Sequence, residues 1–387
     1  MKILMINKFL YPKGGSETYI QLLGKALQKQ GHEVQYFGMD HPQRTMGNRV
    51  GAYVQAMDLR RGGTKDALRV LYSREARRKL RQVLEDFQPD VCHVNNFNYQ
   101  LTPSILLEIS RWRKQTGRHC PIVYTAHDYQ LVCPNHMCRS PKGNCGSCVH
   151  GQVWHCAVNR CIHDSRAKSI LGAAEAALWR LLGVYRRIDR VICCSAFLQE
   201  KLEQHPHLRG KTLVMRNFLP GKREERTGVG EYVLYFGRFS REKGLDTLMA
   251  AAKRLPDIPF VLAGSGDILP ESLPNAENLG FLQGEQLQSW IRNARLTVCP
   301  SEWYENCPFS ILESLQLGVP VLGADIGGIP ELICPGENGD LFVSGDPENL
   351  AEKLRKLWQD PLPCIDTGLQ TVEEYAASLL EGVYGQL

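Results

Sequence analysis

The sequence of 387 residues contains no apolar run long enough to cross a membrane as a helix. Such a helix needs roughly 18 or more apolar residues with few or no charges. The longest candidate, residues 170–184, is interrupted by Glu175 and Arg180. The segment Lys2–Lys8 has too short an apolar core for a secretory signal and lacks a small-residue cleavage site. We therefore expect a cytoplasmic protein in which this segment forms a buried first strand.

Low-complexity segments and nucleic-acid recognition modules are also missing from the sequence. Apolar residues make up 43% and charged residues 22% of the chain, which is typical of a globular protein. Because a single core rarely grows beyond about 250 to 300 residues, the length predicts two domains. We expect no nucleic-acid partner, since no recognition motif accompanies the basic residues.

The formal net charge of +5 conceals an uneven distribution. Residues 1–215 contain 32 Lys and Arg against 16 Asp and Glu, whereas residues 216–387 contain 14 against 25. The first half is therefore basic and the second acidic. Basic clusters at Arg74–Arg81 and Arg180–Arg190 predict peripheral contact with an anionic membrane surface or an acidic acceptor. A solvated helix face explains these clusters equally well.

Apolar runs alternate with amphipathic segments from end to end, which is the pattern of βα units on parallel sheets. The predicted strands of the first half are residues 3–6, 34–37, 91–94, 122–125, 190–194 and 212–215. Those of the second half are residues 232–236, 259–263, 296–298 and 319–322. Helical spacing of apolar residues predicts helices at residues 17–30, 245–255 and 286–293.

The polar stretch at residues 218–230 is the natural linker, and it coincides with the change in charge sign. We therefore predict an α/β protein with two Rossmann-like, doubly wound parallel-sheet domains that face a cleft. The first domain would span residues 1–217 and carry a cysteine-rich insert at 133–161. The second domain would span residues 231–362. Residues 363–387 would provide a C-terminal helix that packs back on the first domain.

Two carboxylates eight residues apart, Glu305 and Glu313, form the most informative motif of the chain. Pro308 suits the first turn of a helix, where its missing N–H costs nothing. Glu305 then precedes the helix, and Glu313 lies about a turn and a half inside it. Both are near unpaired backbone N–H groups at the positive end of that helix. The pattern favours a polyhydroxylated, phosphorylated ligand, although two surface glutamates at this spacing also occur by chance.

Positive side chains follow the first predicted strand of the second domain. In the segment Phe236–Gly244, Arg238 and Lys243 are placed to clamp a diphosphate. Arg would do so by two parallel hydrogen bonds and Lys as a point charge. Gly264 lies in a turn after the next strand, where the backbone can approach a ribose or base closely. Surface charge by chance is the alternative interpretation of both cations.

Two features of the first domain also lie at strand ends. Gly14 and Gly15 open the first helix, where backbone N–H groups favour an anion. The third glycine of a dinucleotide fingerprint is absent, and a plain tight turn is the alternative. His127 follows the strand at residues 122–125 and would face the cleft. It could hydrogen-bond a hydroxyl or donate to a leaving phosphate, or it could be purely structural.

In combination, these motifs resemble retaining glycosyltransferases of family 4. The resemblance rests on Tyr235–Gly244, Leu262–Gly266, Pro300–Ser301, the Glu305/Glu313 pair and Leu317–Val321 in that order, with Gly14–Glu17 and Asn217 from the first half. It covers nearly the whole chain and implies a GT-B fold. It also implies a nucleotide-diphosphate sugar as donor, held mainly by the second domain. The first domain would bind a glycan or lipid-linked acceptor.

The resemblance assigns the cations and the histidine to the reacting centre. Arg238 and Lys243 would hold the donor diphosphate, with help from the backbone at Gly14 and Gly15. His127 matches the histidine beside the reacting centre. Because cations and helix N-termini would neutralise the departing diphosphate, no catalytic metal is expected.

The resemblance also assigns the carboxylates to the donor. Glu313 would bind the ribose hydroxyls and Glu305 the hydroxyls of the donor sugar. Backbone amides at Phe309 and Ser310 would contact the same sugar. Where many relatives have Gly-Phe-Gly, this chain has Cys307–Ser310. The sugar preference of the family therefore does not carry over.

The implied activity is transfer of a sugar, with retained anomeric configuration, in the synthesis of a cell-surface polysaccharide or glycolipid. The enzyme would be cytoplasmic or peripheral on the cytoplasmic face of the membrane. Two alternatives remain open. A GT-B-fold nucleotide-sugar epimerase would release nucleotide with no acceptor present, and a non-catalytic scaffold would only bind the nucleotide sugar. A scaffold is disfavoured because it has no need of both the paired carboxylates and the two cations.

Cysteine is abundant, and six of the fourteen cysteines lie in residues 133–161. Four of them have spacing typical of zinc ligands: Cys145, Cys148, Cys156 and Cys161. We predict that they form a structural zinc site on the acceptor side. Further ligands are available at Cys133, Cys138, His136, His150 and His155. Disulfides and idle thiols are the alternatives, although a reducing compartment disfavours disulfides.

Overall fold

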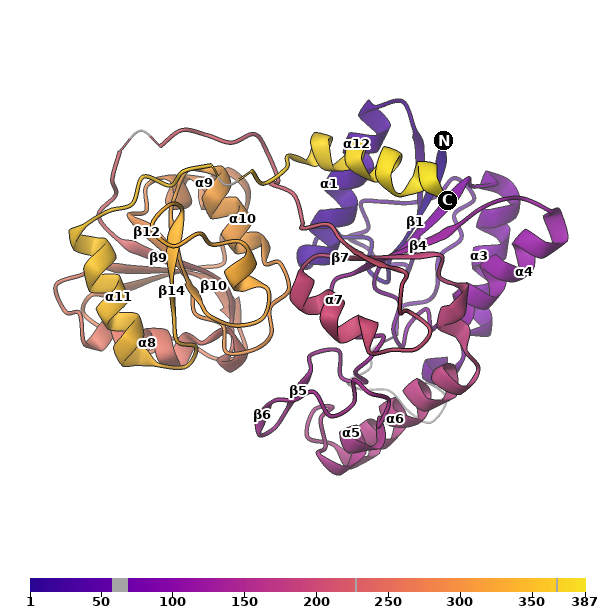
Figure 1. Ribbon diagram of the computed structural model, residues 1–387, viewed down its shortest axis with the longest axis horizontal. Coiled ribbons are helices and arrows are strands. Elements are labelled where there is room, and N and C mark those ends of the chain that lie inside the picture. Colours follow the sequence, from indigo (N-terminus) through magenta and orange to yellow (C-terminus); the bar gives the residue numbers. More distant parts are fainter. Residues whose placement is uncertain (58–68, 227, 367) are drawn as a thin grey trace. The chain divides into compact units, whose positions relative to one another are not determined.

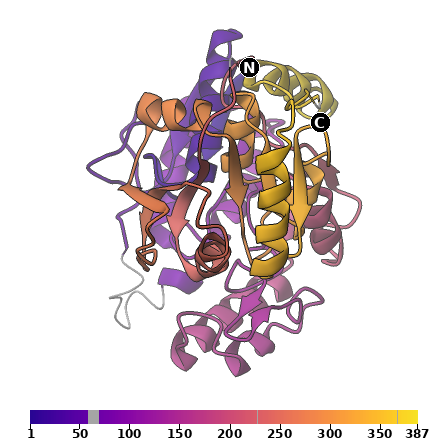
Figure 2. The ribbon, with the colours of Figure 1, turned by 90° about the vertical axis from the view of Figure 1, so that its left-hand side faces the viewer.

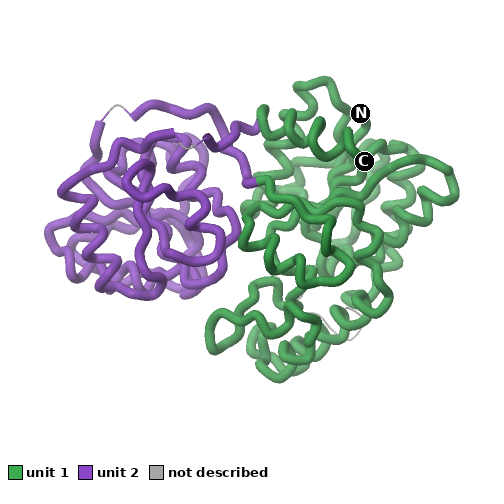
Figure 3. The backbone as a smooth tube through the Cα atoms, viewed as in Figure 1, with its two compact units in different colours: residues 1–215, 373–387 green, residues 216–372 purple. Residues whose placement is uncertain are grey.

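Two compact units make up the protein (Figure 3). The computed structural model describes residues 1–57, 69–226, 228–366 and 368–387. Unit 1 consists of residues 1–215 and 373–387, and unit 2 of residues 216–372. Residue 227 of the expected linker and residue 367 of the expected C-terminal segment lie outside the described residues. Each unit contains a six-stranded sheet with helices around it (Figures 1 and 2), so the predicted α/β class is confirmed.

The sheet of unit 1 is fully parallel, with the order β2-β1-β3-β4-β7-β8. Its strands are β1 Lys2–Ile6, β2 Glu33–Phe37, β3 Val91–Val94, β4 Ile122–Ala126, β7 Arg190–Cys193 and β8 Thr212–Val214. Every residue of β3 and β4 is buried. A parallel sheet covered on both faces requires such continuous apolar strands, which explains why the predicted bounds agree with the structure to within one or two residues.

Helices from both ends of the chain cover this sheet. They are α1 Gly15–Lys29, α3 Arg74–Phe87, α4 Ser104–Thr116, α7 Ala196–Glu203 and α12 Val372–Gly382, with short turns η1 Val184–Arg187 and η4 Tyr384–Gln386. The C-terminal helix α12 lies beside α1 (Figure 1), and the hydroxyls of Tyr375 and Tyr19 are 2.9 Å apart. The Tyr384 hydroxyl is 2.5 Å from His93 Nδ1. The end of the chain therefore completes the core of unit 1.

The cysteine-rich insert follows β4. It contains the antiparallel pair β5 Arg139–Ser140 and β6 Gly143–Asn144, then α5 Trp154–Val158 and α6 Arg166–Leu181. Helix α5 packs against α6. Figures 1 and 2 show this part of unit 1 standing away from the sheet. The insert is therefore a satellite of unit 1 with its own small core.

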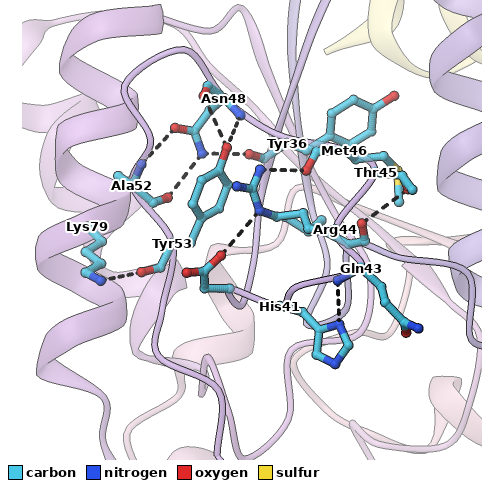
Figure 4. A network of polar contacts seen from close by, with 12 residues as sticks. Tyr36, His41, Gln43, Arg44, Thr45, Met46, Asn48, Ala52, Tyr53 and Lys79 are labelled. Atoms are coloured by element: carbon cyan, nitrogen blue, oxygen red, sulfur yellow. Dashed lines mark hydrogen bonds and ion pairs between the residues drawn. The ribbon is translucent and has the colours of Figure 1, made fainter.

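Polar contacts hold the loop that follows β2 (Figure 4). The Asn48 side-chain amide donates to the carbonyls of Tyr36 at 2.9 Å and Ala52 at 3.1 Å. Its oxygen accepts from the Ala52 N–H at 3.1 Å. The Arg44 guanidinium lies 3.7 Å from the centre of the Tyr53 ring. This loop has almost no regular secondary structure, so side-chain contacts hold it in place instead of hydrogen bonds between strands.

The sheet of unit 2 is also parallel, with the order β11-β10-β9-β12-β13-β14. Its strands are β9 Val233–Phe239, β10 Phe260–Gly266, β11 Ala276–Gly280, β12 Leu296–Cys299, β13 Val321–Ala324 and β14 Gly339–Phe342. The sequence did not predict β11 and β14. Both are edge strands with partly exposed side chains, so neither forms an apolar run.

The helices of unit 2 connect these strands. They are α8 Leu245–Lys253, α9 Gly284–Arg292, α10 Phe309–Gln316 and α11 Pro347–Gln359, with short turns η2 Arg241–Lys243 and η3 Ile329–Glu331. In the described part of the whole chain, no helix combines the length and the apolarity needed to cross a bilayer.

In both units the strand order reverses beside the first strand. The reversal lies between β1 and β3 in unit 1 and between β9 and β12 in unit 2. Open α/β sheets bind ligands at the carboxyl ends of the strands next to such a reversal. These two edges are therefore the places to look for a site.

Candidate functional site

The end of β9 and the turn that follows it carry two cations at the carboxyl edge of the unit 2 sheet. Arg238 lies near the end of β9, is half exposed and pairs with Glu242. Lys243 ends the turn η2. The next residue, Gly244, has a φ of +72°, and a Cβ there would lie 1.7 Å from the carbonyl oxygen of Pro300. Only glycine lets this loop pass so close to the loop that follows β12.

Glu305 lies on the loop between β12 and α10, and Lys243 donates to its carboxylate. Glu305 Oε1 also accepts from Ser301 Oγ at 2.9 Å and from Trp303 Nε1 at 2.7 Å. Burial would raise the pKa of Glu305, but the charge of Lys243 and these hydrogen bonds lower it below its ordinary value. Glu305 is therefore an ionised carboxylate held in one position at neutral pH.

Neighbouring groups support this pair from two sides. The Gly328 N–H, on the loop after β13, donates to the Glu305 carbonyl at 2.7 Å. The ammonium of Lys243 lies 5.3 Å from the centre of the Trp303 ring, a cation–π distance. The Asn217 amide donates to the Cys307 carbonyl at 3.0 Å. Three separate segments thus position one loop.

Helix α10 begins directly after this loop, as the sequence predicts. Pro308 is its N-cap residue, and Phe309 and Ser310 form its first turn. The first N–H groups of a helix have no partner within it, which includes those of Phe309 and Ser310, and their predicted contact with the donor sugar stays a prediction. Glu313 lies within α10, and burial raises the pKa of its carboxyl to about 7. The pKa values of the two carboxyls are therefore shifted in opposite directions, although Glu305 lies on the loop just before the helix that carries Glu313.

The packing of two strands explains why residue 264 is a glycine. It lies in β10 opposite Gly237 of β9, and a Cβ at this position would lie 1.9 Å from the Gly237 carbonyl oxygen. The close approach of two strands thus accounts for the glycine. The predicted contact of Gly264 with a ribose or base stays a prediction.

Unit 1 has a polar cluster where β1 and β3 end. Gly14 is the N-cap residue of α1, and Gly15 is its first residue. The buried carboxylate of Glu17 accepts from Asn7 Nδ2 and from Ser16 Oγ, each at 2.8 Å. Burial raises the pKa of Glu17 above its ordinary value, although these hydrogen bonds work against the rise. The start of α1 is thus tied to the end of β1.

His127 follows β4 and belongs to the same cluster. Its Nε2 lies 2.8 Å from Asn95 Oδ1, which can only accept, so the proton is on Nε2. The ring packs edge-on against Tyr19 at 4.8 Å. Burial lowers the pKa of His127 to about 4, which makes the ring neutral at pH 7. A neutral ring suits a hydrogen bond to a hydroxyl better than the predicted donation of a proton to a leaving phosphate.

The sequence interpretation missed Asn95 and Trp303, and it named Ser301 only as part of the family resemblance, without its contact to Glu305. Asn95 holds His127, and Ser301 and Trp303 hold Glu305. Asn95 begins a polar run directly after β3, and a position just after a strand is the same kind of signal that pointed to His127 after β4. Trp303 gave no such signal, and the contacts of Ser301 and Trp303 with Glu305 depend on how the loop folds.

The six cysteines of the insert lie in one place. They line a single cavity of about 10 Å³ and comprise Cys133, Cys138, Cys145, Cys148, Cys156 and Cys161. All are free thiols. Among the described residues, however, no group of three or more Cys, His, Asp and Glu is arranged to hold a metal ion. The structure brings the predicted ligands together but does not support the zinc site, which stays a prediction.

Two family models match the chain. The model described as Glycosyltransferase Family 4 matches residues 13–219, which is more than half of the sequence. The model described as Glycosyl transferases group 1 matches residues 222–369. The boundary between the two matches lies where the fold passes from unit 1 to unit 2.

Individual relatives are distant. A 42.6 kDa uncharacterised protein from the cps region of Klebsiella pneumoniae is 23% identical over 357 residues, covering 86% of this chain and 87% of the relative. An uncharacterised glycosyltransferase of Methanocaldococcus jannaschii is 27% identical over 177 residues, or 44% of this chain, and the match spans 49% of that relative. The structure of Anabaena HepE in complex with UDP and glucose covers 100% of both chains at 18% identity, with a TM-score of 0.67. This likeness shows the fold, and the expected GT-B architecture of two Rossmann-like domains is confirmed.

Proposed function

The chain belongs to glycosyltransferase family 4, and on that basis we propose that it moves a sugar from a nucleotide-diphosphate donor to a glycan or lipid-linked acceptor with retained configuration. The observation that carries the proposal is the contact between Lys243 and Glu305. It joins the loops after β9 and β12 at the reversal of strand order, where this fold class binds ligands. A phosphate-binding cation and a hydroxyl-binding carboxylate are thereby adjacent.

The cations and the start of α10 would bind the donor diphosphate. Lys243 has three N–H donors, of which Glu305 takes one, so others remain for phosphate oxygens. Arg238 is half exposed and presents a planar fork that matches a phosphate. The positive end of α10 adds a partial charge of the same sign.

The carboxylates would bind the hydroxyls of the donor. Lys243, Ser301 and Trp303 all contact Oε1 of Glu305, so we assign Oε2 to a hydroxyl of the sugar. Glu313, deeper in α10, is assigned to the ribose. His127 of unit 1 is assigned to a substrate hydroxyl, since its neutral ring can share a hydrogen bond without carrying charge.

The proposed reaction is a substitution on one face of the sugar. The bond from the anomeric carbon to the diphosphate oxygen breaks, and the acceptor hydroxyl oxygen bonds to the same carbon from the same side. The hydroxyl proton passes to the departing phosphate oxygen. Negative charge develops on the diphosphate, so Arg238 and Lys243 stabilise the transition state more than the ground state. In this proposal these cations supply the electrostatic stabilisation without a catalytic metal.

A panel of nucleotide sugars tests the proposal. A donor that binds the folded protein should raise its thermal stability, by about 2.7 kcal/mol at one hundred times the dissociation constant. Nucleotide release should then require an acceptor, which extracted lipids and glycans can supply. Release without any acceptor, together with an epimerised sugar, would point to the epimerase instead. If no nucleotide sugar binds, the proposal fails.

Glu313 predicts a dependence of stability on pH. Its pKa rises from an ordinary value of 4.5 to about 7 in the folded protein. Between these two values the unfolded chain is ionised and the folded chain is protonated, so stability falls as pH rises and becomes level above pH 7. A Glu313→Gln variant should lose this decline. Measuring the melting temperatures of both proteins from pH 4.5 to pH 8 checks this prediction.

The matched control for this measurement is Glu337→Gln, because Glu337 is an exposed carboxylate of the same unit. Its pH profile should follow that of the unsubstituted protein. A decline in the Glu313→Gln variant as steep as in the parent would show that Glu313 is ionised like an ordinary carboxylate.

The zinc prediction is tested by elemental analysis. A thiolate site in the insert should copurify with zinc, and Cys145→Ser/Cys148→Ser should lose both the metal and thermal stability, since binding energy of such a site is folding energy. Cys334→Ser is the control, because Cys334 is the exposed cysteine of unit 2. Less than about a tenth of an equivalent of zinc in the parent protein would show that the thiols act without metal.

A further inference from the structure

The outward face of α6 is apolar. The helix buries Ser169, Gly172, Ala173, Glu175 and Trp179. The opposite face, which we call the α6 stripe, consists of Ile170, Ala174, Leu178, Leu181 and Leu182. These residues follow the spacing of one helical face. A surface helix normally turns its polar side to water, so the row of exposed apolar residues on α6 is unusual.

Exposed apolar residues concentrate here. The described part of the chain exposes 14 large apolar residues, and six of them lie between Trp154 and Leu182. Leu181 is 86% exposed and Leu182 56%. Single exposed apolar residues are normal in proteins, but a contiguous patch marks a binding surface. Helix α5, which packs on α6, adds the exposed Trp154.

Positive charge surrounds the stripe. Residues 139–187 contain eight Lys and Arg against two Asp and Glu. Arg160, Arg166 and Arg186 are exposed, and within the described residues none of them pairs with an acidic side chain. Glu175 points inward, and burial raises its pKa to about 8, so this carboxyl is mostly uncharged at neutral pH. The surroundings of the stripe are thus cationic.

We propose that the α6 stripe docks the protein on an anionic lipid surface. The apolar side chains would enter the boundary between headgroups and acyl chains, and the arginines at either end would meet lipid phosphates. Interfacial helices bind in this way, through apolar area together with attraction to anionic lipid. The inference rests on the proposed function for its purpose, since a lipid-linked acceptor is found at such a surface.

The α6 stripe is a different membrane-binding surface from the basic clusters expected from the sequence. Arg77 and Arg81 of the Arg74–Arg81 cluster pair with the buried Glu108, at 2.6 Å and 3.4 Å. Arg180 of the second cluster is only partly exposed and lies against Gly151. These arginines therefore serve the fold of unit 1. The apolar stripe, which no charge count reveals, is the better anchor.

A second copy of the chain is the rival occupant of the stripe. Packing α6 against α6 would bury the same leucines. It would also bring positive ends together in either orientation, because Arg166 stands at one end of the helix and Arg186 just beyond the other. Like charges at such a contact oppose association. An anionic surface has the complementary charge.

Flotation with vesicles tests the inference. The protein, without donor or acceptor, is mixed with vesicles of phosphatidylcholine alone or with added phosphatidylglycerol. We expect binding to the anionic vesicles, weakened by added salt. The double variant Leu181→Ser/Leu182→Ser should bind at least about tenfold more weakly, since two leucines no longer leave water. Its melting temperature should not change, because both side chains are exposed in the folded protein.

Two controls make the test specific. Leu269→Ser in unit 2 removes a leucine that is also 86% exposed, and its vesicle binding should equal that of the parent. Arg166→Gln/Arg186→Gln should weaken binding to anionic vesicles and reduce its salt dependence. The inference is overturned if the parent protein does not float, or if the leucine double variant floats equally well. It is also overturned if that variant instead dissociates a dimer in the absence of lipid.

The two proposals can fail separately. Flotation uses neither donor nor acceptor, so its failure leaves the transferase proposal intact. If no donor binds, the proposal that the α6 stripe binds anionic lipid is unaffected.

Discussion

Arg238→Ala should lower kcat/KM at least about 100-fold, which is the loss seen when one preorganised charge donor is removed from a transition state. The stability of the folded protein should change little. Arg238 is half exposed, and its ion pair with Glu242 is a surface contact within one turn of chain, of a kind worth about 0 to 1 kcal/mol. Steady-state kinetics with the identified donor and a melting curve check both parts.

Arg241→Ala is the matched control for this variant. Arg241 lies three residues further on, in the turn η2, but its side chain is 82% exposed, and among the described residues its one ion pair is a 3.8 Å contact with Asp246. Its kinetics should equal those of the parent. Equal losses in both variants would mean that positive charge attracts the donor in general, and unchanged kinetics in Arg238→Ala would remove Arg238 from the site.

Glu305→Gln should produce an equally large loss of activity together with a loss of stability. Glutamine keeps the size of the side chain but removes the charge that Lys243 faces. Breaking a buried ion pair from one side costs about 3 to 5 kcal/mol, because the remaining charge is left uncompensated. We therefore expect a lower melting temperature for unit 2 and a kcat/KM reduced by at least about 100-fold.

A double-mutant cycle separates these two effects. Lys243→Ala and Glu305→Gln remove the same pair, so their stability losses should be far from additive. Glu337→Gln, an exposed carboxylate of unit 2, should leave stability and kinetics unchanged. Additive stability losses would mean that the pair seen in the structure makes no net contribution. Kinetics close to those of the parent in the Glu305→Gln variant would withdraw Glu305 from donor binding.

Local patterns predicted much of the fold. Central strands such as β3 have the predicted bounds, because a strand buried on both faces is a continuous apolar run. The edge strands β11 and β14 escaped prediction because their exposed sides break that run. The start of α10 was also predicted, since Pro308 marks the first turn of a helix.

The sequence named Lys243 and Glu305 as candidate site residues but did not predict that they contact one another. Lys243 and Glu305 are separated by 62 positions in the chain. They meet because β9 and β12 are neighbours in the sheet, although β10 and β11 lie between them in sequence. The contacts of Ser301 and Trp303 with Glu305 were not predicted, because they too depend on how the loop folds. Spacing also selected four cysteines of the insert, where the fold gathers six around one cavity.

The sequence by itself determined the family and the two α/β units, and it supplied the residues proposed to bind a phosphorylated sugar, because these depend on short-range spacing and composition. Only the tertiary structure decided which charges neutralise one another and which faces remain open. Glu305 is ionised because a distant lysine reaches it, and His127 is neutral because the core surrounds it. The apolar stripe of α6 faces outward because its opposite side is buried in unit 1. Burial and long-range pairing set these properties, and neither can be read from neighbours along the chain.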